Sequence, residues 1–285
     1  YHITMRPLSQ MMMQPSQSDL QVWLNSKFNP MVDANPSIRD RLAKPRGRDG
    51  VNNSSMKSYP GGFLMFAWSG SPKTMRGRSA PLIIADEVDG YEGTDEGHPV
   101  ALLWQRAATF GDQRKLVEIS TPTIKGQSYI EKAFEAGDQR RFWVPCPHCG
   151  EMQWLRFERL LWEKGAPETA RYHCSACDHP MQEHDKTAMF GGGEWRATAE
   201  GQDPHTIGFH ISALYSPVGW LSWAQIARDW EAAQGKPEDI KTFKNTVLGE
   251  TWQEQGEAPD WERLVERRED FAMGVVPTGA LVLTA

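Results

Sequence analysis

The chain has 285 residues, of which 39% are hydrophobic and 24% are charged, and its formal net charge at pH 7 is −6. This composition is typical of a soluble globular protein, and the length allows one large domain or two ordinary ones. It excludes a membrane-spanning chain, because no apolar run approaches the roughly 18 residues needed, and it excludes a surface covered in basic, phosphate-binding side chains.

The first predicted elements are a strand and a helix. Residues 10–14 are mostly apolar and end at a proline, which predicts a short strand. Ser16 or Ser18 is suited to cap the helix that follows, whose apolar side we expect to comprise Leu20, Val22, Trp23 and Phe28. Residues 46–59 are polar and contain glycine and asparagine, so we expect a loop there.

The next segments alternate between strands and a helix. Residues 62–68, 82–85 and 115–120 are apolar runs bounded by turn residues, and residues 99–110 have a helical pattern. The run at 82–85 is apolar at every position, as buried parallel strands are. This alternation predicts a parallel α/β sheet.

The pattern changes in the second half of the chain. Residues 142–196 contain all four cysteines and short strand-like pieces such as 152–157. Beyond them we expect strand character within 195–214, helices at 223–233 and 239–248, a charged and turn-rich segment at 249–271, and a new strand at 279–285.

The cysteines form two pairs, Cys146-Pro-His-Cys149 and Cys174-Ser-Ala-Cys177, with 24 residues between the inner members. Two residues between thiolates let a tight knuckle direct both sulfurs at one ion, and two knuckles supply the four soft ligands that tetrahedral zinc prefers. Two disulfides or inert buried thiols are the alternatives, and disulfides are disfavoured in a chain without a secretory signal. We therefore predict a structural zinc ribbon, with the glycine after Cys149 at a positive φ.

An adjacent acid pair, Asp86-Glu87, follows the apolar run at 82–85. The carboxyl end of a parallel strand is where α/β sheets bind ligands. Hydrolysis of a nucleoside triphosphate needs one carboxylate to hold Mg²⁺ and another to orient and deprotonate the attacking water. Asp86 is suited to the first task and Glu87 to the second, although strands also end in acids without any such role.

Two neighbouring features favour a nucleotide site. Ser120-Thr121 ends the next strand, 34 residues after Asp86, where a hydroxyl pair can bond to the acids and couple hydrolysis to movement. Arg76 and Arg78 lie in a turn that we expect near the same edge, and a guanidinium there can stabilise the transferred phosphoryl group, often in a neighbouring subunit's site.

The phosphate-binding loop is missing from this pattern. The nearest candidate, residues 69–74, imitates the end of a GxxxxGK[ST] loop, but Ala67 and Pro72 occupy its two glycine positions. Pro72 also lacks the N–H that a phosphate cradle needs, and too few residues remain before the acid strand for the required helix. We expect the true loop to lie upstream of Tyr1, so that this chain alone has little or no ATPase activity.

Taken together these residues resemble the large subunit of phage terminase, in the lambda-like branch. The resemblance covers nearly the whole chain and rests, in order, on LIIADEVDGY, EISTPT, VPCPHCGEMQWL, FHISALYSP and FKNTVLGETW. It implies a motor that cuts concatemeric double-stranded DNA and pumps it into a procapsid, using an ATPase with a P-loop core and a nuclease of RNase H-like fold.

The resemblance also assigns individual roles. Asp86 and Glu87 match the acid motif of the ATPase, Ser120 and Thr121 match its coupling motif, and Arg76, rather than Arg78, matches the arginine finger that acts in trans. The family's P-loop residues and nuclease carboxylates have no counterpart in this chain. The implied cofactors are ATP, Mg²⁺ bound by Asp86, and structural zinc.

Partners and location follow from the same resemblance. It implies double-stranded DNA, the terminase small subunit, the portal and procapsid, and a homo-oligomeric ring as partners, with no membrane, in the cytoplasm of the bacterial host. The fold class implied is α/β: a partial P-loop, ASCE-type ATPase sheet with an inserted or appended zinc ribbon and a helical linker region.

The predicted organisation has four parts: a partial ATPase core at 1–138, the zinc ribbon at 139–196, a strand with a helical linker or subdomain at 197–275, and the first strand of a nuclease domain at 276–285. Two other functions stay open. Asp86-Glu87-Val88-Asp89 also satisfies the DExD motif of a superfamily-two helicase-like translocase, although no second motor half follows. The remaining alternative is a catalytically silent zinc-ribbon module that binds DNA or protein.

Overall fold

The computed structural model describes residues 1–42, 53–71, 77–95 and 97–253. The chain separates into two compact units, Tyr1–Trp252 and Gln253–Ala285, and the described residues belong almost entirely to the first. The predicted strand at 276–285 and the candidate Arg76 lie outside the described residues.

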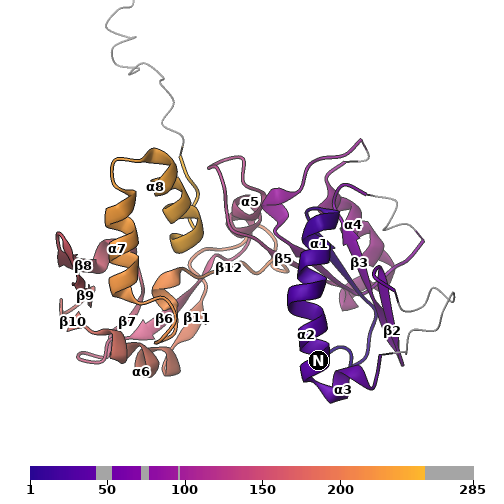
Figure 1. Ribbon diagram of the computed structural model, residues 1–285, viewed down its shortest axis with the longest axis horizontal. Helices are drawn as coiled ribbons and strands as arrows, with labels where there is room; N and C mark the ends of the chain where they lie inside the picture. The colour runs from indigo at the N-terminus through magenta and orange to yellow at the C-terminus, as the bar shows by residue number, and fades with distance from the viewer. Residues whose placement is uncertain (43–52, 72–76, 96, 254–285) are drawn as a thin grey trace, which may run out of the picture. The chain divides into compact units, whose positions relative to one another are not determined.

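The N-terminal part of the first unit is built on a five-stranded sheet in the order β2-β3-β1-β4-β5 (Figure 1). Strands β3, β1, β4 and β5 run parallel, and β2 pairs antiparallel with β3. The predicted parallel α/β sheet is therefore confirmed. Its strands are β1 (Gln10–Gln14), β2 (Met56–Tyr59), β3 (Gly62–Trp68), β4 (Leu82–Asp86) and β5 (Lys115–Ile119).

Helices connect these strands. They are α1 (Gln17–Trp23), α2 (Asn29–Ala34), α3 (Pro36–Arg39), α4 (Pro99–Ala107) and α5 (Tyr129–Ala136), and a π-helical segment, Leu24–Phe28, joins α1 to α2. The Ser16 side chain accepts a hydrogen bond from the Asp19 N–H at 3.1 Å, which confirms the predicted helix cap. Val22 was expected on the apolar side but is 64% exposed, because the buried stripe follows Leu20, Leu24 and Phe28 at four-residue spacing.

The sheet separates two apolar cores. On one face Met11 and Met13 of β1 pack with Ile83 and Ala85 of β4 and with Leu103 of α4. The opposite face, which α1 covers, comprises Met12, Leu64 and Phe66 with Leu20, Leu24 and Phe28. Figure 1 shows α1 and α4 on opposite sides of the sheet. This alternation along β1 is what a strand buried on both faces requires, since successive side chains point to opposite faces.

One strand was not expected. Residues 56–59, predicted as part of a loop, form β2, which folds back on β3 through a turn in which Gly61 has φ 91°. The Tyr59 hydroxyl bonds to the carbonyl of Leu8, and the buried Gln10 donates to the same hydroxyl at 2.8 Å. The prediction was wrong because residues 56–59, although mostly polar, pair with β3 across this turn, and Leu8 and Gln10, which are distant in sequence, hold Tyr59 in place.

The remainder of the first unit contains small sheets and two larger helices. Its elements are β6 (Arg140–Pro145), β7 (Met152–Trp154), β8 (Leu160–Glu163), β9 (Ala166–His173), β10 (Pro180–Met181), α6 (Lys186–Gly191), β11 (Glu194–Arg196), β12 (Phe209–His210), α7 (Trp223–Ala233) and α8 (Pro237–Phe243). The helix predicted at 223–233 is confirmed as α7. The one predicted at 239–248 begins two residues earlier, as α8, and continues as a π-helical segment, Lys244–Leu248.

The cysteine-rich strands and the two helices share one core. Tyr172 of β9 and Trp223 of α7 are both essentially buried, and their ring centroids lie 5.7 Å apart. The same cluster contains Cys146, Cys174 and Phe243. Segments that the sequence predicts as separate parts, 139–196 and 197–275, therefore pack on each other through apolar side chains within the described residues, which extend to residue 253.

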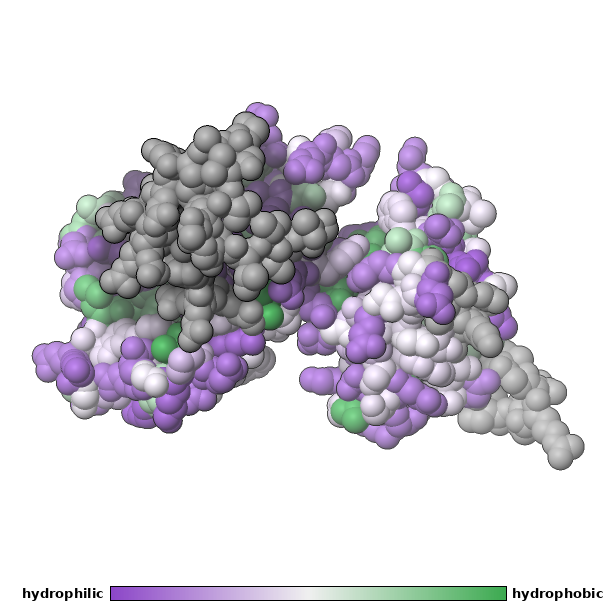
Figure 2. Space-filling view, turned by 90° about the horizontal axis from the view of Figure 1, so that it is seen from above, coloured by the Kyte–Doolittle hydropathy of each residue, from purple (hydrophilic) through white to green (hydrophobic). Residues whose placement is uncertain are grey.

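Figure 2 shows one face of the molecule. Where described residues are visible on it, hydrophilic side chains and side chains of intermediate hydropathy are interspersed, and hydrophobic ones are scattered among them. The most exposed large apolar residue of the described part of the chain is Trp220, at 82%. Among the described residues, no helix combines the length and apolar character needed to cross a bilayer.

Candidate functional site

The acid pair lies at the carboxyl edge of the parallel sheet. Asp86 is the last residue of β4, and Glu87 follows with φ 55° and ψ 49°, the left-handed region that non-glycine residues seldom occupy. Holding a non-glycine residue there costs on the order of 1–3 kcal/mol, which the surrounding structure must offset. The left-handed conformation of Glu87 turns the chain sharply at the carboxyl edge of the sheet, which is the edge where α/β sheets bind ligands.

Gln14 orients Asp86. The Gln14 side chain is 4% exposed, and its amide nitrogen Nε2 donates to Asp86 Oδ2 at 2.8 Å. The contact follows from the strand register. Met13 of β1 is level with Ala85 of β4, so the residues that follow them, Gln14 on β1 and Asp86 on β4, are neighbours. Sequence reasoning missed Gln14, and the available signal was a polar residue at the same end of a neighbouring strand.

The hydroxyl pair predicted from the sequence lies beside the acids. Asp86 is paired with Ile119 of β5, so Ser120 and Thr121 emerge at the same edge. Partial burial raises the pKa of Glu87, the neighbouring Asp86 charge raises it further, and a hydrogen bond from the Thr121 backbone opposes both effects. A carboxylate whose pKa is raised is a better proton acceptor near neutral pH, which suits a group that activates water.

Asp89, three residues after Asp86, makes more contacts at this edge than any residue that the sequence singled out. Its N–H donates to the Ser120 hydroxyl at 3.2 Å. Its carboxylate accepts hydrogen bonds from the Thr123 N–H and hydroxyl, at 3.0 and 2.8 Å, and from the Ile130 N–H, at 2.8 Å. The sequence placed Asp89 only in the helicase-like DExD pattern and did not predict this role.

The structure does not bring Arg78 to the acids. Its guanidinium lies 5.6 Å from the centroid of the Phe63 ring, near the start of β3. Because β3 and β4 both run parallel to β1, with Leu64 and Leu82 both level with Gln10, Phe63 lies toward the opposite edge of the sheet from Asp86, about 16 Å away along a strand. The expectation that this turn shares the acids' edge is wrong for Arg78, because the chain returns to the beginning of a parallel strand. Arg78 therefore cannot reach the acids of its own chain.

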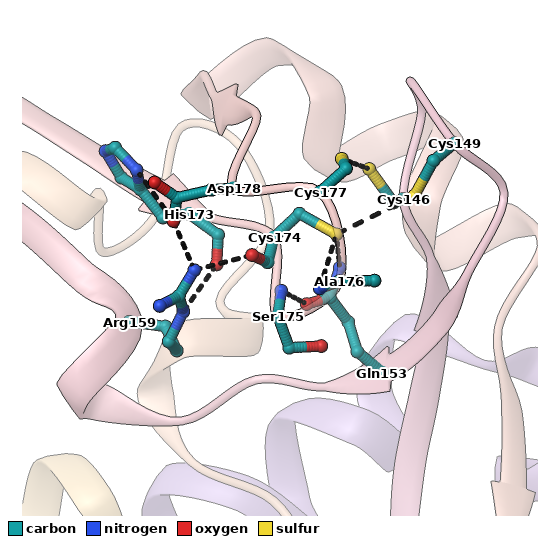
Figure 3. A network of polar contacts seen from close by, with 10 residues as sticks. All are labelled: Cys146, Cys149, Gln153, Arg159, His173, Cys174, Ser175, Ala176, Cys177 and Asp178. Carbon is teal, nitrogen blue, oxygen red and sulfur yellow. Dashed lines mark hydrogen bonds and ion pairs between the residues drawn. The ribbon is translucent and has the colours of Figure 1, made fainter.

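The four cysteines converge on one point (Figure 3). Their sulfur atoms all lie within 4.8 Å of one another, with Cys146 Sγ 3.9 Å from Cys177 Sγ and Cys149 Sγ 3.8 Å from Cys174 Sγ. Zinc–sulfur bonds of about 2.3 Å in a tetrahedron place the sulfurs about 3.8 Å apart. These distances exceed a disulfide bond of about 2.05 Å almost twofold, so the geometry matches metal coordination and excludes disulfides.

Both knuckles have the same backbone geometry. The residue after the second cysteine of each pair is left-handed, Gly150 with φ 77° and Asp178 with φ 57°. The Gly150 N–H donates to the Cys146 carbonyl at 2.9 Å, and the Asp178 N–H donates to the Cys174 carbonyl at 3.1 Å. The predicted positive φ at Gly150 is confirmed, and the second knuckle achieves it with an aspartate, which tolerates this conformation.

Polar side chains hold the second knuckle in place, as Figure 3 shows. Gln153 donates to Cys174 Sγ at 3.5 Å and accepts a hydrogen bond from the Ser175 N–H at 2.8 Å. Arg159 donates to the Cys174 carbonyl and to the Asp178 carboxylate. Such contacts orient the ligands of a metal site and tune their charge.

The thiols differ in pKa. Burial raises the pKa of Cys146 to about 12. Burial also acts to raise the pKa of Cys174. Hydrogen bonds from the N–H groups of Cys177 and Ala176 and from neighbouring thiols outweigh burial and lower this pKa to about 7. Cys174 is thus more readily ionised than Cys146, and a thiolate is the form that binds metal.

Comparison with known proteins identifies the family. A sequence model described as the phage terminase large subunit gpA, ATPase domain, matches residues 1–195, and one described as the terminase large subunit gpA, endonuclease domain, matches residues 206–285. The chain therefore belongs to the gpA family of phage terminase large subunits, as the sequence resemblance indicated.

Individual relatives agree with this assignment. The terminase large subunit of Enterobacteria phage P21 is 32% identical over 321 aligned positions, covering 100% of this chain and 48% of that protein. The corresponding subunit of Escherichia phage lambda is 32% identical, covering 95% of this chain and 46% of that protein. The chain thus spans about half the length of these curated relatives. Among solved structures, the large terminase ATPase domain of Thermus phage P74-26 is 14% identical, covers 87% of this chain and 79% of that one, and has a TM-score of 0.43, too low to support an argument.

Proposed function

We propose that this chain is part of an ATP-driven motor that packages double-stranded phage DNA into a procapsid. The observation that carries the proposal is the edge at which Asp86 and Glu87 meet Ser120 and Thr121, within the residues matched by the terminase ATPase family. Carboxylate and hydroxyl oxygens are the ligands that Mg²⁺ prefers. The family assignment does not favour a helicase-like translocase or a silent zinc module.

Each residue at this edge has a proposed task. Asp86 would hold Mg²⁺, which would offset phosphate charge when bound, and Gln14 orients the Asp86 carboxylate through its hydrogen bond to Oδ2. Glu87 accepts the proton of the attacking water, since its raised pKa makes it a stronger base than an ordinary carboxylate. Ser120 and Thr121 couple the state of the site to movement. An arginine finger from a neighbouring subunit, Arg76 or Arg78, stabilises the charge on the transferred phosphoryl group.

The test is Glu87→Gln in a terminase large subunit that contains these residues together with a phosphate-binding loop. We expect hydrolysis to be lost while ATP binding persists, because the amide keeps the shape of the side chain but cannot accept the proton. Glu92→Gln is the matched control, since Glu92 is an exposed glutamate five residues further on. Normal hydrolysis by the Glu87 variant would contradict the assignment of the base.

We also propose that Cys146, Cys149, Cys174 and Cys177 bind one structural zinc ion. Support comes from the sulfur spacing and from the two matching knuckles. Four thiolates complete a tetrahedral set and leave no open position for catalysis, so the ion would stabilise the fold of the core shared by the strands and α7.

Metal analysis of the purified chain tests this proposal. We expect about one zinc per chain, loss of the metal in Cys146→Ser, and retention in His205→Ala, because His205 is exposed and lies outside the four-cysteine cluster. Protein purified without chelators that contains no zinc would contradict it.

The proposed partners are those of the complete motor. They are double-stranded DNA, the small terminase subunit, the portal and procapsid, and further copies of the large subunit in a ring, in the cytoplasm of the bacterial host. The endonuclease activity belongs to the same proposal, because the endonuclease family model matches residues 206–285.

A further inference from the structure

The segment between β5 and α5, residues 120–128, is bonded from the side of the acid pair by Glu87, which accepts from the Thr121 backbone, and more extensively by Asp89. Asp89 bonds to Ser120, to both donors of Thr123, and to the N–H of Ile130. Ile130 lies in the first turn of α5, where N–H groups lack partners within the helix and a negative charge is favourable. Asp89 thus joins the turn after Glu87 to this segment and to the start of α5, through its N–H at Ser120 and through its carboxylate at Thr123 and Ile130.

The same segment is held from its other side by Thr251 and Trp252. The Trp252 N–H donates to the Thr123 carbonyl at 2.8 Å, and the Lys125 N–H donates to the Trp252 carbonyl at 2.9 Å. These bonds form a parallel bridge between Ile124 and Trp252. Trp252 is also the last residue of the first compact unit.

A second contact reinforces this attachment. Glu131 of α5 accepts a hydrogen bond from the Thr251 hydroxyl at 2.6 Å with one oxygen and from the Gly126 N–H at 2.8 Å with the other. Thr123 is therefore the meeting point: its side chain and N–H face Asp89, and its carbonyl faces Trp252.

We propose that Asp89 is a positioning residue that transmits the state of the nucleotide site through Thr123 to Trp252. The inference rests on the proposed function of the Asp86–Glu87 edge. When the terminal phosphate is lost, Ser120 and Thr121 move and displace Thr123. The backbone hydrogen bonds between Thr123, Lys125 and Trp252 then move Trp252, the residue before segment 253–285. Those residues lie within the match to the endonuclease domain.

The first test is Asp89→Asn in a terminase large subunit containing these residues. The amide keeps the shape but replaces one acceptor by a donor and removes the charge, and a hydrogen bond to a charged group is large enough that its loss lowers kcat roughly tenfold or more. We expect KM for ATP to change by less than about twofold, because the substitution leaves in place the Asp89 N–H that bonds to Ser120 and alters only the carboxylate that bonds to Thr123 and Ile130. Unchanged kcat, whether or not KM is raised, would overturn the proposal.

The second test follows the linkage itself by hydrogen exchange. In the parent protein a non-hydrolysable ATP analogue should slow amide exchange at residues 121–131, which include Lys125. It should also slow exchange at Trp252. In Asp89→Asn we expect the response at Trp252 to disappear while the analogue still binds. A Trp252 response equal to that of the parent would show that Asp89 does not carry the signal, whatever its effect on stability.

Two further variants test whether Asp89 and Thr123 act through the hydrogen bond that they share. Thr123→Val removes the hydroxyl that bonds to Asp89, so its effect on kcat should not add to that of Asp89→Asn in the double variant. Additive effects would refute the shared linkage. Thr198→Val is the matched control, because the Thr198 hydroxyl donates to the Gln139 carbonyl, which lies outside this segment.

Failure of this inference differs from failure of the proposed function. If Glu87→Gln abolishes hydrolysis while Asp89→Asn behaves like the parent in both tests, the acid edge keeps its role and the linkage does not exist. If Glu87→Gln hydrolyses ATP normally, the proposed function itself is wrong.

Discussion

The contact between Gln14 and Asp86 provides a direct test of the acid edge. Gln14→Glu keeps the size of the side chain but replaces the donating Nε2, 2.8 Å from Asp86 Oδ2, with a second carboxylate oxygen. Two unit charges at that distance repel by about 6 kcal/mol at an effective dielectric constant of 20. This value is an upper bound, because the introduced carboxyl avoids it by staying protonated, which gives the pair a shared proton.

The sign of the pH dependence follows from this shared proton. The introduced carboxyl has a raised pKa in the folded state, so its contribution to stability is complete at low pH and is lost as the pH rises through that value. We expect Gln14→Glu to match the parent chain near pH 4 and to be less stable by roughly 2 kcal/mol at pH 7.5, the size expected when a buried charged group loses its partner. For a chain of this length that difference lowers Tm by about 4–8 °C.

Thermal unfolding of the purified chain at several pH values measures this effect. Gln21→Glu is the control, because it adds the same charge at an exposed position of α1. In a terminase large subunit that contains these residues, Gln14→Glu should also lower ATP turnover at pH 7.5. Equal stability of Gln14→Glu and the parent across the whole pH range would refute the contact between Gln14 and the acid edge.

Three other predictions concern the stability of the chain. Leu103 of α4 is fully buried between helix and sheet, so Leu103→Ala should lower the free energy of unfolding by about 2–5 kcal/mol in a denaturant titration. Lys186 is also fully buried, with its Nζ 2.7 Å from Glu183 and 3.2 Å from the Ser216 carbonyl. Glu183→Gln should therefore destabilise the chain by about 3 kcal/mol, and a smaller loss in Lys186→Met, which removes the buried charge, would support this reason. Burial lowers the pKa of His210 to about 4, with the Arg141 charge adding to the effect. Stability should then fall by up to about 3 kcal/mol as the pH drops from 6.5 to 4, and His210→Gln should remove this dependence; an imidazole that titrates near 6.5 by NMR would contradict it.

Local patterns in the sequence determined most of the elements. The strands at 10–14, 62–68 and 82–86 and the helix at 223–233 lie where apolar periodicity and turn residues predict them. The spacing of Cys146, Cys149, Cys174 and Cys177 predicted one cluster, and the structure brings the four sulfurs together. These features depend on residues close in sequence or on a knuckle whose geometry two intervening residues define, so the amino-acid order is sufficient to predict them.

Contacts between distant strands were decided only by the tertiary structure. Gln14 reaches Asp86 because β1 pairs with β4, and Arg78 lies at the far edge because β3 and β4 run parallel. Asp89 and Trp252 are 163 residues apart and meet at Thr123 through hydrogen bonds that no local pattern encodes. Strand order and register depend on the packing of all the elements at once, and hydrogen-bonding capacity alone does not specify which of many polar side chains will be neighbours.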